Sequence, residues 1–102
     1  MNFFRKKDHV FVSIVPDELN GPTEKLRDSL LGVLPVPSGN DLKISLGSAP
    51  DLPVKNLTVI MSFVTQLKSD GIKVVFTASN EILDAIAAMG LSSYFDTIER
   101  EK

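Results

Sequence analysis

The sequence contains no cysteine and only one histidine among its 102 residues. Without cysteine, the chain has no disulfide, no thiol nucleophile and no thiolate ligand for a metal ion. The histidine, His9, stands beside charged residues at the expected start of a strand, where a histidine is usually a solvated surface residue. We therefore expect no metal, no cofactor and no catalytic centre, and we interpret the protein as a non-enzyme.

Long apolar runs and a strong charge of one sign are missing as well. No stretch approaches the roughly 18 apolar residues of a membrane span, and the first residues lack the order of a secretory signal. The formal net charge is -2, which gives no general attraction to nucleic acid or anionic lipid. The basic cluster Arg5, Lys6 and Lys7 is typical of a solvated strand end. We expect a cytoplasmic protein without nucleic-acid partner or direct membrane insertion.

The composition that is present is that of one globular domain. Hydrophobic residues make up 43% and charged residues 24% of the chain, which is enough apolar surface to form a core. Neither an internal repeat nor a low-complexity tract divides the sequence. We interpret residues 1–102 as a single domain.

Apolar periodicity and turn-forming residues predict alternating strands and helices. Strands are expected over residues 2–6, 10–15, 41–46, 72–78 and 95–99. Apolar positions at helical spacing predict helices after Pro22, after Pro53 and after Ser79, and Gly71 and Gly90 are expected to end the last two. The prolines between residues 35 and 37 are expected to form a loop.

The resulting order is β-β-α-β-α-β-α-β, which predicts an α/β fold with a mixed, mostly parallel sheet of four to five strands covered by about three helices. The strand over residues 72–78 contains the uninterrupted apolar run Val74, Val75 and Phe76. Such a run is typical of a central strand that is covered on both faces. We therefore expect Val75 to behave as a core residue.

The middle of the chain carries a recognisable succession of short motifs. Ser45-Leu46 ends a strand, and Pro53-Val54-Lys55-Asn56-Leu57 opens a helix. Gly71, a buried strand and a capped helix follow, and then Gly90-Leu91 and Phe95. This succession resembles the STAS family, the domain shared by sulphate transporters and anti-sigma-factor antagonists. Upstream, residues 15–19 are similar to the turn between the family's second strand and first helix.

The family's helix opens with Asp-Ser-Ser-Gly-Leu, and in members that act as phosphorylation switches a hydroxyl of this motif accepts the phosphate. Val54 and Lys55 occupy the two hydroxyl positions here, so the resemblance implies a member without the usual switch. We expect the same surface to contact a partner, which Lys55 would select for its acidic groups. The predicted partner-binding residues are Pro53, Val54, Lys55, Asn56 and Thr58.

The resemblance implies a non-catalytic protein-protein interaction module of a bacterial regulatory system, similar to an anti-sigma-factor antagonist. Its partner would be a protein such as an anti-sigma-factor-like kinase, with the chain itself a monomer or weak dimer. A cytoplasmic STAS-like accessory subunit of a membrane transporter is an alternative, and an unrelated small α/β carrier domain is another.

Three further groups have plain structural interpretations. Asp17 and Glu18 are expected to stabilise a helix start. The hydroxyls of Thr58 and Ser62 are expected to face solvent along the second long helix. The isolated glycines of the chain do not form the closely spaced set that binds a nucleotide phosphate.

Overall fold

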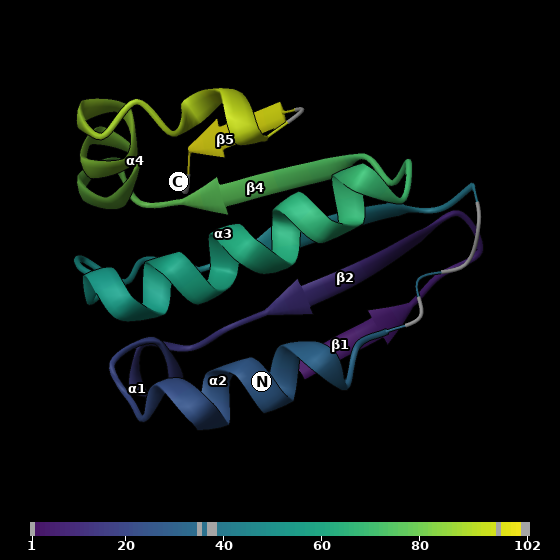
Figure 1. The fold of residues 1–102 in the computed structure, drawn as a ribbon, viewed down its shortest axis with the longest axis horizontal. Coiled ribbons are helices and arrows are strands. Elements are labelled where there is room, and N and C mark those ends of the chain that lie inside the picture. Colours follow the sequence, from purple (N-terminus) through teal and green to yellow (C-terminus); the bar gives the residue numbers. More distant parts are fainter. Residues whose placement is uncertain (1, 35, 37–38, 96, 101–102) are drawn as a thin grey trace.

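A computed structural model describes residues 2–34, 36, 39–95 and 97–100. Within these residues the elements are β1 (Asn2–Arg5), β2 (His9–Ser13), α1 (Pro16–Leu19), α2 (Thr23–Leu31), β3 (Asp41–Ser45), α3 (Val54–Ser69), β4 (Val74–Ala78), α4 (Asn80–Ala88), the 3-10 helix η1 (Ser92–Tyr94) and β5 (Thr97–Arg100). The α/β architecture predicted from the sequence is confirmed (Figure 1).

The five strands form one sheet in the order β1-β2-β3-β4-β5. β1 is antiparallel to β2, and the four strands β2 to β5 run parallel to one another. In this register Phe4 lies opposite Phe11, and Val75 lies opposite Thr97. The sheet is therefore mixed but mostly parallel, as expected.

The helices cover only one face of the sheet. In β2, β3 and β4 every second residue is buried, while the residues between them stay at least partly exposed. Figure 1 shows α2 and α3 lying across the front of the sheet. Because each parallel connection moves one strand further in the same direction, right-handed crossovers keep their helices on one side.

The prediction that the fourth strand is covered on both faces is wrong. Val74, Phe76 and Ala78 are buried, but Val75 and Thr77 are only half-buried because no helix packs on their side. Val75 thus lies outside the core, although its sequence context is apolar throughout.

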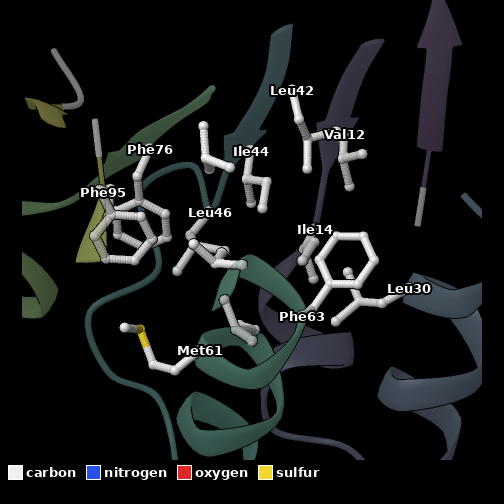
Figure 2. Packing of buried hydrophobic residues seen from close by; sticks show 14 of the residues in the cluster. Val12, Ile14, Leu30, Leu42, Ile44, Leu46, Met61, Phe63, Phe76 and Phe95 are labelled. Atoms are coloured by element: carbon white, nitrogen blue, oxygen red, sulfur yellow. The ribbon is translucent and has the colours of Figure 1, made fainter. Parts of the chain in front are cut away.

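The core lies between the helices and the covered face of the sheet. Figure 2 shows Ile44 and Leu46 between the sheet and α3, and the ring of Phe63 from α3 beside Leu30 from α2. The rings of Phe76 and Phe95 stack with their centroids 4.2 Å apart and an interplanar angle of 18°. This stack anchors the segment before β5, so the fifth strand is fixed by packing as well as by its backbone pairing.

Helix ends follow the predicted signals closely. Ser79 is the N-cap of α4, and its hydroxyl accepts a hydrogen bond from the Ile82 N–H at 3.4 Å. Gly71 and Gly90 follow α3 and α4 with φ of 82° and 73°, a left-handed conformation that favours glycine.

Local differences from the prediction occur where connections are short. The turn after β2 contains the short helix α1, and η1 precedes the last strand, which begins at Thr97. Part of the expected proline loop (Pro35, Pro37 and Ser38) and Asp96 of the expected last strand lie outside the described residues.

Candidate functional site

The start of α3 is exposed, as the predicted partner surface requires. Pro53 is the N-cap residue, and its carbonyl accepts the Leu57 N–H at 2.9 Å. Pro53, Val54 and Lys55 are all exposed, and 69% of Val54 is accessible. An apolar side chain this open has no packing role within the described chain, which makes it available to another molecule.

Asn56 does not belong to that surface. It is only 1% exposed, and its amide nitrogen donates to the carbonyls of Leu19 at 2.6 Å and Gly21 at 3.1 Å. Its Oδ1 accepts the hydroxyl of Thr23 at 2.7 Å. The side chain therefore fastens the connection between α1 and α2 to the start of α3, and it cannot contact a partner in this arrangement.

Thr58 lies one turn further along α3 and is exposed. Its hydroxyl donates to the Val54 carbonyl at 2.9 Å, a local bond that a helix surface commonly offers to threonine. Ser62 is exposed one turn later. Both hydroxyls thus have the solvent-facing position expected from the sequence, and they lie on the ridge between two grooves described next.

The larger groove runs along α3 on the side of α4 and η1 and has a volume of about 580 Å³. Three of its apolar side chains are strongly exposed: Val54, Met89 at 45% and Tyr94 at 42%. None of the described residues that line it carries a charge. They are Val54, Leu57, Thr58, Met61, Ser62, Thr65, Gln66, Ser69, Met89, Leu91 and Tyr94.

Two neighbouring hollows extend this surface. One of about 440 Å³ lies between α2 and α3 and includes Leu31, which is 54% exposed, and Arg27. A smaller one of about 170 Å³ shares Val54 and Met89 with the larger groove and includes the acidic residues Asp51 and Glu81. The uncharged groove thus has a negative end beside the start of α3.

The exposed start of α3 was predicted from the sequence, but the groove beside it was not. Met89 is the C-cap residue of α4 and remains exposed. Tyr94 received no role. The available signal was a group of apolar residues placed just beyond a helix end, where the packed face of the helix no longer covers them.

The remaining polar candidates have local roles. Glu18 Oε1 accepts the Val15 N–H at 3.3 Å and so supports the start of α1, a short helix that precedes the helix predicted after Pro22. His9 Nδ1 lies 2.8 Å from Asp8 Oδ1 at the turn between β1 and β2. The hydrogen bond with His9 lowers the pKa of the exposed Asp8 below its ordinary value, and nearby positive charge adds to the effect.

The described residues also bear on metal binding and on membrane crossing. Over these residues, no group of three or more potential ligands lies close enough together to hold a metal ion. Within the same part of the chain, no helix has both the length and the apolar character needed to cross a membrane.

Comparison with known proteins adds no identity: no model of a protein family matches the sequence, and no curated protein matches it significantly.

Proposed function

We propose that the protein is a non-catalytic interaction domain that binds another protein through the start of α3 and the uncharged groove beside it. The observation that carries this proposal is the coincidence of the two features. Val54, at an expected contact position, is also one of the apolar residues that line both the large groove and its acidic end. Apolar surface of this kind, bounded by polar residues, is typical of protein-binding sites.

The resemblance to the STAS family supports a regulatory role of this kind. Both the element order and the exposed helix start agree with what the resemblance implies. At the positions of the family's phosphorylated hydroxyls, Val54 has no hydroxyl and Lys55 cannot form a phosphate ester. We propose an antagonist-like, cytoplasmic module of a bacterial regulatory system whose binding is not switched at this motif.

The groove also indicates the chemistry of the partner. Its uncharged lining accepts apolar side chains, and burying them excludes water from Met89 and Tyr94. Lys55 is exposed but lines neither the large groove nor its acidic end, where Asp51 and Glu81 lie. The complementary surface of the partner is therefore an apolar ridge, with an acidic group facing Lys55 and a basic group facing Asp51 and Glu81.

Affinity capture from native cells with matched variants tests the proposal. Wild type and Thr97→Glu, a change on exposed β5, are expected to retain the same partner protein, whereas Met89→Glu loses it because a carboxylate is buried in the groove. Capture of a kinase-like regulator supports the regulatory role. Capture of a transporter subunit instead supports the alternative role as an accessory subunit of a membrane transporter. Capture that Met89→Glu leaves unchanged would remove the groove from the binding site.

The purified partner allows a direct measurement of the contact. Tyr94 is the single tyrosine and the chain has no tryptophan, so the tyrosine emission of this chain reports on the groove alone. The emission of the partner is measured in a separate titration and subtracted. Titration of a tryptophan-free partner fragment is expected to change the emission at saturation. Unchanged emission, together with binding that Met89→Glu does not weaken, contradicts the proposed site.

A further inference from the structure

The two edges of the sheet differ in how they are protected against pairing with another chain. β5 carries charged residues on both of its faces, Glu99 and Arg100, which is a common way to prevent edge association. β1 is also exposed along its whole length, but it places one exposed phenylalanine on each face, Phe3 (41% exposed) and Phe4 (55% exposed), and carries its charge, Arg5, only at the end of the strand. Two open phenylalanines make β1 the unprotected edge.

The register of the hairpin shows which backbone groups of β1 are free. At the turn, the Lys6 N–H donates to the His9 carbonyl at 2.8 Å. Bonded and non-bonded pairs alternate in an antiparallel ladder, so Phe4 also forms a bonded pair with Phe11. The N–H and C=O groups of Phe3 and Arg5 consequently point away from β2, and no other strand of the described chain pairs with them.

We propose that β1 pairs in antiparallel fashion with β1 of a second copy of this chain, about a two-fold axis at Phe4. In this register the outward groups of Phe3 meet those of the partner's Arg5, and the reverse pair forms by symmetry, which completes both bonded pairs. The two Phe4 side chains then face each other across a non-bonded pair, next to Phe11 in each copy. The two sheets join into one continuous sheet.

Charge favours this register. The Arg5 guanidinium already lies 5.7 Å from the centroid of the Phe3 ring, and in the dimer it also faces Phe3 of the other copy, so the cations meet aromatic rings instead of each other. Lys6 faces the uncharged Asn2. No two like charges are directly opposite, which removes the usual electrostatic obstacle to pairing two identical strands.

The dimer leaves the groove beside α3 free. β1 is one edge of the sheet, whereas α4, η1 and β5 lie at the other (Figure 1). Each dimer would present two grooves to a partner and so increase its apparent affinity for paired sites. The dimer does not depend on the function proposed for the groove, because the two surfaces share none of the residues named for them.

Sedimentation equilibrium over a wide concentration range tests the association. A four-residue edge pair is small, so we expect a weak dimer with a dissociation constant between about 1 and 100 μM. Phe4→Lys places like charges at the axis and is expected to weaken dimerisation at least tenfold, whereas Thr97→Lys on β5 leaves it unchanged. Phe3→Pro removes an outward N–H without breaking the ladder to β2, and it should give the same loss.

Disulfide trapping tests the register, because the chain has no cysteine of its own. Under a mild oxidant, Phe4→Cys is expected to form a covalent dimer much faster than Asn2→Cys or Thr97→Cys, since only position 4 faces itself across the axis. A protein that remains monomeric at about 1 mM, a concentration at which a pair of this strength is largely associated, overturns the proposal. So does trapping at position 97 or position 2 that equals trapping at position 4.

Discussion

Replacement of Asn56 by alanine is expected to destabilise the fold strongly although the residue looks like a surface position in the sequence. The variant leaves the buried Leu19 carbonyl without the donor that lies 2.6 Å away, and a buried unsatisfied acceptor costs about 1–3 kcal/mol. Gly21 and Thr23 also lose their hydrogen bonds to Asn56. Because these bonds are only partly buried, losing each one costs about 0.5–1.5 kcal/mol of stability. We expect a total loss of about 2–6 kcal/mol of unfolding free energy.

Urea denaturation of matched variants measures this loss. Thr23→Val removes one of the three bonds and is expected to cost about 0.5–1.5 kcal/mol. Thr58→Ala, on the same helix, loses only a local bond at an exposed site and should change stability by less than about 0.5 kcal/mol. The m-value should stay constant through the series, since each folded variant keeps the same buried surface.

Asn56→Asp sharpens the test because it keeps the shape of the side chain. Its carboxylate faces the Leu19 and Gly21 carbonyl oxygens, so it lacks both donors and adds repulsion, and we expect a cost at neutral pH at least equal to that of Asn56→Ala. Protonation restores one donor, so its deficit relative to wild type should narrow at acidic pH. A loss below about 1 kcal/mol for both Asn56 variants at neutral pH would refute the interpretation of Asn56 as a buried clamp.

The other predictions concern the core, the partner surface and the turn. Ile60→Ala, at a fully buried position, is expected to lower the free energy of unfolding by about 2–5 kcal/mol in chemical denaturation. Val75→Ala, on the open face of the sheet, should lower it by about 1 kcal/mol or less. Similar losses for the two variants would contradict a sheet that is covered on one face only. Lys55→Glu should raise the stability of α3 by about 0.3–1 kcal/mol, because the start of a helix favours negative charge. The same variant should weaken the binding of an acidic partner, measured by calorimetry. An unchanged affinity at low salt would remove Lys55 from the contact. In an NMR titration His9→Ala should return the pKa of Asp8 toward its ordinary value. The bond with His9 favours ionised Asp8, so its stabilising effect is present above the unfolded-state pKa of Asp8 and is lost as the pH falls through the folded-state pKa. An unchanged pKa of Asp8 in the variant would exclude the bond with His9 as the cause.

The order and type of the main elements could be predicted from the amino-acid sequence alone. Gly71 and Gly90 mark the helix ends because their left-handed backbone is easily reached only by glycine. The apolar spacing from Leu57 to Leu67 predicts the packed face of α3, and these side chains are buried. Such features depend on local backbone preference and on periodicity, which neighbouring residues specify without the rest of the fold.

The partner surface was predicted only in part from the sequence. Its exposed start at Val54 and Lys55 follows from their position at a helix beginning. Asn56 lies in the same short motif, but its environment depends on the connection between α1 and α2, whose contacting residues Leu19 and Gly21 lie 37 and 35 positions away. Pairing across such distances has no local signal.

Which apolar residues remain exposed depends on how the elements pack in three dimensions and could not be predicted from the sequence. Val75 has apolar neighbours on both sides in the sequence, yet it is half-buried because all the parallel connections place their helices on the opposite face of the sheet. Met89 and Tyr94 likewise become walls of one groove because α4 and η1 end beside α3. The periodicity of apolar residues along the chain predicts the direction in which a side chain points. Whether another element covers that side chain depends on the packing of segments that are distant in the sequence.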